Sequence, residues 1–270
     1  METLKHALPS GAVLTAYLHS SSPEMPWPVC KARPAVIICP GGAYCFTSAR
    51  EQDPPAAVFL NMGLQVFVLE YSVGEKAGGK LPLEELARSV LYVRRHSAQW
   101  QIDPDKLLIL GFSAGGHLAA SLGVHWDDPE ILARCGLENG KAIRPDGLIL
   151  AYPVITTGEY AHRESCNTVT AGSTEPMEYW SLETQVTDKV PPVFIWQTAQ
   201  DKSVPVQNSY LFVGALLRAG VPCEYHMFAR GQHGISVCTS EVGTPSASVK
   251  QWIPLCRMWI EEQFGELGGM

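Results

Sequence analysis

Short apolar runs alternate with stretches of helical period from residue 35 to the end of the chain. These runs are rich in Val, Ile and Leu and are bounded by turn residues, which is typical of buried strands. Residues 83–95 instead place their apolar side chains at helical spacing. The alternation predicts an α/β fold with a mostly parallel sheet that helices cover on both faces. The predicted strands of this sheet are 35–39, 64–71, 106–110, 147–154, 193–198 and 223–228.

The chain begins with a different pattern. Residues 3–9 and 12–19 alternate like strands around Ser10-Gly11, which indicates a hairpin. A loop rich in Pro and Ser is expected at 20–34. With the hairpin included, the predicted sheet has eight strands.

The second half of the chain adds two helices and one irregular segment. We predict helices at 206–219, where Gly220 ends the helix, and at about 253–264. Residues 155–190 lose any clear period, and we expect them to form a short cap insertion over the sheet. We expect residues 1–270 to form one α/β domain, for which this length is sufficient.

Two starts are open for the helix that follows the strand at 35–39. Ser48 and Glu51 have the spacing of a capping box. Asp53 with Pro54 in the first turn is the alternative.

Composition excludes several classes of protein. The chain is 46% apolar and 17% charged, as ordinary globular proteins are. Its net charge of −7 argues against nucleic acid or an anionic membrane surface as a partner. The first ten residues are too polar for a signal peptide, and no run reaches the roughly 18 apolar residues of a membrane span. The eight cysteines form no C-x-x-C pair, so we expect no metal site and a reduced, cytoplasmic protein. A secreted protein that has lost its signal is the alternative.

The stretch 107–125 carries the clearest chemical signal. An apolar strand runs into Gly111-Phe112-Ser113-Ala114-Gly115, and a helix of small residues follows. G-x-S-x-G between a strand and a helix is the nucleophile elbow, a strained turn that exposes a serine hydroxyl above the sheet edge. The plain alternative is a glycine-rich turn that joins a strand to a helix. The combined pattern favours Ser113 as a nucleophile.

A serine nucleophile needs a base and a group that orients the base. His233 lies in a Gly-Gln-His-Gly loop just after the last strand, where it can reach the serine. His117 and His226 are weaker candidates, since one points away along the helix and the other lies within a strand. Asp201 follows the strand at 193–198 and precedes a helix, whereas Asp188 comes before that strand, at the wrong end of the sheet. We predict Ser113, Asp201 and His233 as the catalytic residues.

The oxyanion of an acyl-transfer intermediate needs preorganised donors. The amide of Ala114, the residue after the nucleophile, is one candidate. The loop after the strand at 35–39 contains Gly41-Gly42-Ala43-Tyr44, whose backbone can turn amides inward.

These motifs resemble those of α/β-hydrolase esterases. The group includes bacterial acetyl-xylan and feruloyl esterases, also described as xylanase-like or carbohydrate acetylesterases. The resemblance covers roughly residues 35–265 and rests on GFSAGGH, Pro-Gly-Gly-Ala-Tyr, Ser-Ala-Arg-Glu, Ala-Gln-Asp and Gly-Gln-His-Gly. It implies the α/β-hydrolase fold, the same three catalytic residues, and Gly42, Ala43 and Ala114 as oxyanion donors. Pro40 stands where lipases of the His-Gly-Gly-Gly pattern have histidine, which leaves the second donor open.

We expect a serine carboxylesterase that hydrolyses small acyl esters, with acetyl groups on a sugar as the leading substrate. No cofactor is required, and a homodimer is the candidate assembly. Aromatic side chains near the site can stack on sugars or pack in the core, and Arg50 can reach the pocket rim or form a surface ion pair. The alternatives are a serine exopeptidase and a non-catalytic binding protein of the same fold. The predicted substrate contacts are Tyr44, Arg50, Phe112 and Tyr152.

Overall fold

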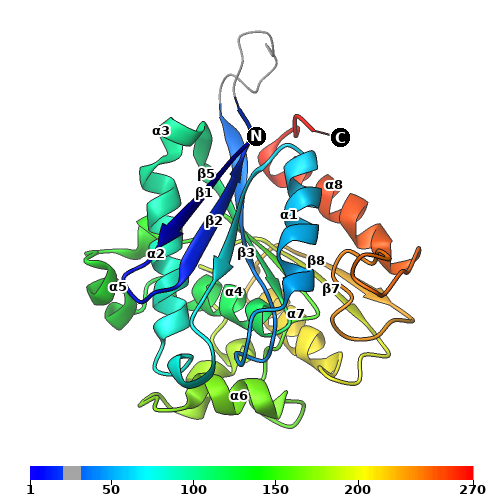
Figure 1. Ribbon diagram of the computed structural model, residues 1–270. Coiled ribbons are helices and arrows are strands. Elements are labelled where there is room, and N and C mark those ends of the chain that lie inside the picture. Colours follow the sequence, from blue (N-terminus) through cyan, green and yellow to red (C-terminus); the bar gives the residue numbers. More distant parts are fainter. Residues whose placement is uncertain (21–31, 270) are drawn as a thin grey trace.

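Eight strands form one sheet in the order β1-β2-β4-β3-β5-β6-β7-β8 (Figure 1). The computed structural model describes residues 1–20 and 32–269, so most of the loop expected at 20–34, and Cys30 with it, lies outside the described residues. The predicted eight-stranded, mostly parallel sheet is confirmed. The strands are β1 Glu2–Ala7, β2 Val13–Leu18, β3 Arg33–Cys39, β4 Gln65–Glu70, β5 Ile102–Phe112, β6 Gly147–Ala151, β7 Val193–Thr198 and β8 Cys223–Phe228.

Strand β2 runs opposite to the other seven strands of the sheet. The β1–β2 hairpin is antiparallel, and β2 pairs antiparallel with β4. From β4 to β8 every neighbouring pair is parallel. Strands β6 and β7 are buried along their whole length, as expected where helices cover both faces. The parallel strands therefore end together at one edge, which we call the carboxyl edge.

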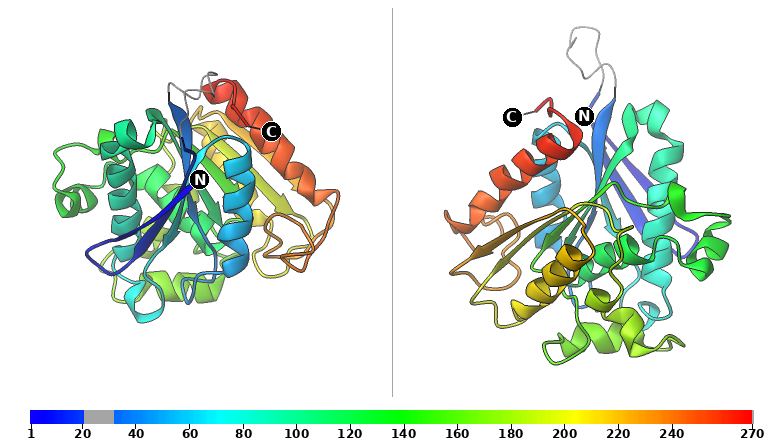
Figure 2. Two further views of the ribbon diagram at one scale, coloured as in Figure 1. Left: turned by 45° about the horizontal axis from the view of Figure 1, so that its top comes forward. Right: turned by 180° about the vertical axis from the view of Figure 1, so that it is seen from behind.

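Helices cover the two faces unequally (Figure 2). Buried side chains of α1 and α8 belong to the apolar cluster on one face, and those of α2, α4 and α7 belong to the cluster on the other. Three further short helices complete the set. The helices are α1 Asp53–Asn61, α2 Leu81–Arg95, α3 Ser97–Trp100, α4 Ala114–His125, α5 Pro129–Cys135, α6 Arg163–Thr170, α7 Gln207–Arg218 and α8 Trp252–Phe264.

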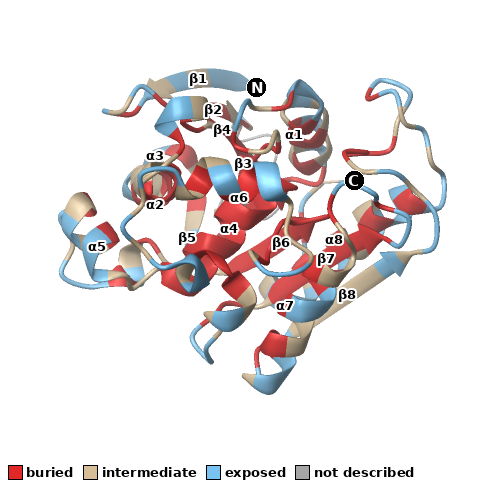
Figure 3. Cartoon of the chain, turned by 90° about the horizontal axis from the view of Figure 1, so that it is seen from below, coloured by how far each residue is buried: buried red, intermediate tan, exposed pale blue. Residues whose placement is uncertain are grey.

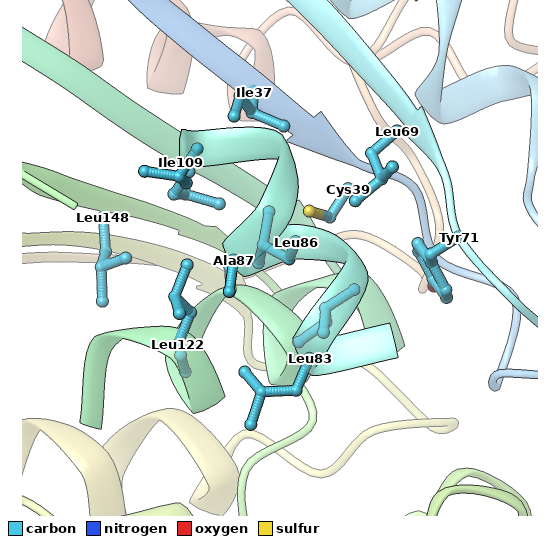
Figure 4. Packing of buried hydrophobic residues seen from close by; sticks show 14 of the residues in the cluster. Ile37, Cys39, Leu69, Tyr71, Leu83, Leu86, Ala87, Ile109, Leu122 and Leu148 are labelled. Atoms are coloured by element: carbon cyan, nitrogen blue, oxygen red, sulfur yellow. The ribbon is translucent and has the colours of Figure 1, made fainter. Parts of the chain in front are cut away.

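Helix α4 lies close to the sheet because its residues are small. A Cβ added to Gly123 would come within 2.5 Å of Leu148 Cδ1, so a larger residue there would require the Leu148 side chain to move. Figure 4 shows Leu122 of α4 and Leu83 and Leu86 of α2 in one cluster with strand side chains such as Ile109. This packing fixes the helix that begins at the predicted nucleophile.

Three predictions about helix ends can be compared with the structure. The capping box at Ser48 is wrong, because Ser48 makes no side-chain cap bond and Glu51 turns into the protein. The alternative start is correct, since α1 begins at Asp53 with Pro54 in its first turn. Helix α7 ends as expected at Gly220, whose φ is +72°. Val221 N donates to Leu216 O there, which completes a Schellman motif.

Residues 155–190 contain more regular structure than their sequence suggests. Helix α6 and the 3₁₀ helices Met177–Trp180 and Leu182–Thr184 lie within them. Seen from the carboxyl edge, α6 lies in front of α4 (Figure 3). Its half-polar sequence, Arg163 to Thr170, hides the helical period because few of its side chains are buried.

The membrane and cysteine expectations concern the described residues only. No helix there is long and apolar enough to cross a bilayer. The seven cysteines that the structure describes are all free thiols.

Candidate active site

The turn between β5 and α4 has the geometry of a strained elbow. Ser113 stands between the two elements with φ +53° and ψ −118°, a conformation that costs a residue with a side chain on the order of 1–3 kcal/mol. A Cβ added to Gly111 would come within 2.2 Å of Gly115 O, and a Cβ added to Gly115 would come within 2.0 Å of Cys39 O. Both positions therefore require glycine. The Ser113 amide donates to Ala151 O at 3.0 Å, which holds the strained turn against the end of β6.

The structure brings Ser113, His233 and Asp201 into one chain of hydrogen bonds. His233 Nε2 lies 2.8 Å from Ser113 Oγ, and His233 Nδ1 lies 2.7 Å from Asp201 Oδ2. A carboxylate only accepts, so Nδ1–H donates to Asp201 and Nε2 is left to accept the serine proton. The other Asp201 oxygen accepts from the amides of Ser203 and Val204, at 2.9 Å each. The carboxylate is thus fixed from both sides, and its side chain is fully buried.

The loop after β3 turns backbone amides toward the serine. Gly42, Ala43 and Tyr44 have φ values of +129°, +57° and +62° in succession. Within the described chain, the amides of Gly42 and Ala43 donate to no protein acceptor and remain available. Ala114 is the first residue of α4, so its amide has no acceptor inside the helix. All three predicted donors lie around Ser113.

A pocket of about 190 Å³ opens in front of these groups. Its wall includes Gly42, Ala43, Ser113 and His233. Its rim is polar apart from one exposed aromatic ring, and a larger hollow of about 920 Å³ adjoins it along residues 199–203 and 231–233. The rim residues are Phe46, Ser48, Arg50, His162, Glu164 and Ser203.

Arg50 reaches the pocket as expected. A Cβ added to Gly234 would lie 3.4 Å from Arg50 Nη2, so the guanidinium covers the residue next to His233. Arg50 is exposed, and among the described residues it forms no ion pair. The surface salt bridge that we considered is therefore not seen.

The other three predicted substrate contacts are corrected. Tyr44, Phe112 and Tyr152 are each 1% exposed or less, and none lines the pocket. Tyr44 and Tyr152 have positive φ angles of +62° and +39°, and their rings are buried in the protein instead of pointing into the pocket.

Tyr44 has a structural partner in His117. His117 Nε2 donates to the Trp180 carbonyl at 3.0 Å, and its Nδ1 then accepts from the Tyr44 hydroxyl at 2.9 Å. Burial lowers the pKa of His117 to about 4, so the ring is neutral near pH 7. The prediction that His117 points away from Ser113 agrees with these contacts.

Three residues of the pocket were not predicted as site residues. His162 and Glu164 come from the start of α6 in the 155–190 segment, and no motif marks them. His162 Nδ1 bonds Ser165 Oγ at 2.8 Å, and burial followed by repulsion from His233 lowers its pKa. Glu51 lies in the pocket wall; burial raises its pKa, while hydrogen bonds from Tyr152 and Gly41 oppose the rise. Its spacing from Ser48 indicated a helix cap instead of a place in the pocket.

The described residues contain no group of three or more His, Cys, Asp or Glu side chains that could hold a metal ion. What the site offers is an oriented hydroxyl, an imidazole acceptor and inward-facing amides, the parts that acyl transfer uses.

Comparison with known proteins identifies the family. The model of the BD-FAE family matches residues 25–216. The chain is 41% identical over 238 residues, 84% of its length, to endo-1,4-beta-xylanase B of Butyrivibrio fibrisolvens, and 28% identical over 76% of its length to an acetylxylan esterase of Xylanibacter ruminicola. It spans only 35% and 42% of these two proteins.

A solved structure covers nearly the whole chain. The acetyl ester-xyloside bifunctional hydrolase of Caldicellulosiruptor lactoaceticus superposes with a TM-score of 0.81 at 34% identity, over 97% of this chain and 91% of that one. The expected fold and the resemblance to acetyl-xylan esterase-like proteins are thereby confirmed. The chain is an α/β hydrolase that belongs to the BD-FAE family.

Proposed function

We propose that this chain is a serine carboxylesterase that hydrolyses small acyl esters. The observation that carries the proposal is the bonded series Asp201–His233–Ser113 at a strained elbow. His233 takes the serine proton as Ser113 Oγ attacks the ester carbonyl, and it then protonates the leaving alcohol. Water hydrolyses the acyl-serine by the same steps in reverse order. Asp201 keeps Nδ1 protonated and stabilises the imidazolium.

The oxyanion is stabilised by backbone amides. We assign this role to Gly42, Ala43 and Ala114, whose amides are available around Ser113. Loss of one such donor typically costs about 10²- to 10³-fold in kcat. Three consecutive positive φ angles in the loop, at Gly42, Ala43 and Tyr44, orient the amides of Gly42 and Ala43.

The pocket favours a small acyl group. Its volume of about 190 Å³ lies below the roughly 300–1,000 Å³ of common ligand sites. We place the acyl group there and the alcohol in the larger adjoining hollow of about 920 Å³. Acetyl groups on a carbohydrate are the proposed substrate, which the names of two similar proteins support, an acetylxylan esterase and an acetyl ester-xyloside hydrolase.

We further propose that residues 155–190 act as a short cap on a single α/β domain. The segment contributes His162 and Glu164 to the rim, where both can bind hydroxyl groups of the alcohol.

The test compares wild type with Ser113→Ala on p-nitrophenyl acetate, p-nitrophenyl butyrate and acetylated xylo-oligosaccharides. The proposal expects turnover of the acetate and release of acetate from the sugar, both lost in the variant. Equal and negligible turnover by both proteins on every ester would contradict it and favour a binding protein.

A further inference from the structure

A buried carboxylate in the pocket wall has no part in the reaction as described so far. Glu51 is 2% exposed and ends the 3₁₀ turn Ala49–Glu51 that precedes α1. Its Oε2 accepts from the Gly41 amide at 2.8 Å, and its Oε1 accepts from the Tyr152 hydroxyl at 2.6 Å. Both oxygens are acceptors, which is the pattern of an ionised carboxylate. An ionised group buried beside a reaction centre needs a reason to be there.

The first bond holds the oxyanion loop. Gly41 directly precedes the two amides assigned to the oxyanion. A Cβ at Gly41 would lie 2.7 Å from Glu51 Oε2 and 2.9 Å from Ser113 Cβ, so this peptide is held between the carboxylate and the nucleophile. Glu51 therefore fixes the point from which the loop leaves β3.

The second bond reaches the histidine loop. The Tyr152 hydroxyl, while donating to Glu51, accepts from the Ser236 amide at 3.0 Å. The Tyr152 ring packs edge-on against the His233 ring, with centroids 5.0 Å apart. Ser236 Oγ in turn donates to the Arg50 carbonyl at 2.6 Å, which closes the series next to Glu51. One carboxylate thus connects the loops that carry the oxyanion donors and the base.

We propose that Glu51 is a positioning residue that fixes the oxyanion loop and the His233 imidazole together and whose charge stabilises the imidazolium formed during acyl transfer. The inference rests on the proposed function and extends it beyond the triad. Glu51 and His233 both line the pocket, which brings the carboxylate close enough to the imidazole for their charges to interact. Other charged or titratable groups around His233 are Asp201, His162, Arg50, Tyr152, Glu164 and Lys202.

The test is Glu51→Gln, which keeps the size and an oxygen for the Gly41 amide but removes the charge. We expect kcat on p-nitrophenyl acetate to fall about 10- to 100-fold, because a misplaced supporting group costs that much, with KM changed less than threefold. The pKa of His233, measured from the acid limb of kcat/KM, falls because the imidazolium loses a nearby anion. Glu51→Asp, which keeps the charge, restores that pKa.

Glu85 supplies the matched control. It is 1% exposed, lies on α2, and accepts from Ser72 N at 2.7 Å and Ser72 Oγ at 2.5 Å, with no contact to the triad. Glu85→Gln should lower stability and leave kcat and the His233 pKa unchanged.

An NMR titration of the His233 ring in wild type and Glu51→Gln makes the test independent of turnover. If no ester is hydrolysed by wild type, the proposed function fails, while the NMR shift still decides the role of Glu51. If the His233 pKa is unchanged in folded Glu51→Gln, the inference is overturned, whether or not kcat falls. A fall in kcat without a change in that pKa would indicate a purely structural defect.

Discussion

Residues with side chains adopt positive φ more often at the carboxyl edge of the parallel sheet than at its amino edge. At the carboxyl edge, residues with side chains adopt positive φ after β3, β5 and β6: Ala43, Tyr44, Ser113 and Tyr152. At the amino edge, the turns ahead of β4 and β8 use Gly63 and Gly220, and Gln101 ahead of β5 is the exception. Glycine makes such turns without strain, whereas other residues pay on the order of 1–3 kcal/mol each.

The difference indicates where the fold accepts strain. The four residues named at the carboxyl edge each contribute a group to the site or to its support: the Ser113 hydroxyl, the Tyr44 and Tyr152 hydroxyls, and the Ala43 amide. Buried polar contacts of the 155–190 segment and of Glu51 hold these turns in place. Gly63 and Gly220 at the amino edge have no side chain to contribute, so their turns only connect elements.

The largest expected effect is a loss of activity at the carboxyl edge with little loss of stability. Asp201→Asn keeps an oxygen for the Ser203 and Val204 amides, but it presents an amide to His233 and favours the wrong tautomer. We expect kcat to fall about 10⁴-fold with little change in Tm. Steady-state kinetics and a thermal melt check this; activity within tenfold of wild type would remove Asp201 from the triad.

A buried cation tests how the 155–190 segment is anchored. Lys80 Nζ lies 3.0 Å from Asp128, 3.0 Å from Glu130 and 2.6 Å from Glu175, with its side chain 3% exposed. Lys80→Met removes the cation that the three carboxylates share and leaves Arg134 as the partner of Glu130 alone. We expect the free energy of unfolding to fall by about 3 kcal/mol in urea titrations. Lys189→Met, which removes an exposed ion pair with Asp127, is the control and should change nothing measurable. Equal stability of the two variants would contradict the anchoring role.

The next effect depends on pH. Burial lowers the pKa of His117 to about 4, below the roughly 6.5 of an unfolded chain. The native state resists protonation, so the stability from this group is complete above pH 6.5 and is lost as the pH falls toward 4. Between pH 7 and pH 5 wild type should lose about 2 kcal/mol more than His117→Gln. Urea titrations at both pH values measure this difference, and parallel losses would show that His117 does not stay neutral.

The smallest expected effects are two changes in stability of opposite sign, one at each edge of the sheet. Ser113→Gly relieves a φ of +53° and should raise the free energy of unfolding by about 1 kcal/mol while abolishing ester hydrolysis. Gly220→Ala places a side chain at φ +72°, where its Cβ meets nothing within 4 Å, and should cost about 1 kcal/mol without changing activity. The same sign of stability change in both variants would contradict the contrast between the edges.

The sequence predicted most of the fold because its signals are local. Apolar runs bounded by turn residues located the six strands from β3 to β8, and alternation around Ser10-Gly11 located β1 and β2. The elbow and the Gly-Gln-His-Gly loop fell at strand ends, as the structure has them. Helix α6 was missed because few of its side chains are buried. The loop at 20–34 is mostly outside the described residues.

The site was less predictable where long-range contacts decide it. Ser113, Asp201 and His233 could be selected by motif and by strand order. Glu51 could not, because its capping-box spacing is local while its partner Tyr152 is 101 residues away. The rings of Tyr44 and Tyr152 follow positive φ angles that alternation does not encode.

The most direct test of the proposed reaction is covalent trapping of the nucleophile. Wild type treated with a p-nitrophenyl phosphonate ester should gain one phosphonyl group, shown by intact-protein mass spectrometry and mapped by peptide fragmentation to Ser113. Ser113→Ala should gain none. A label on another residue, or a folded wild type that takes up no label while a known serine esterase in the same buffer does, would contradict the assignment of Ser113 as the nucleophile.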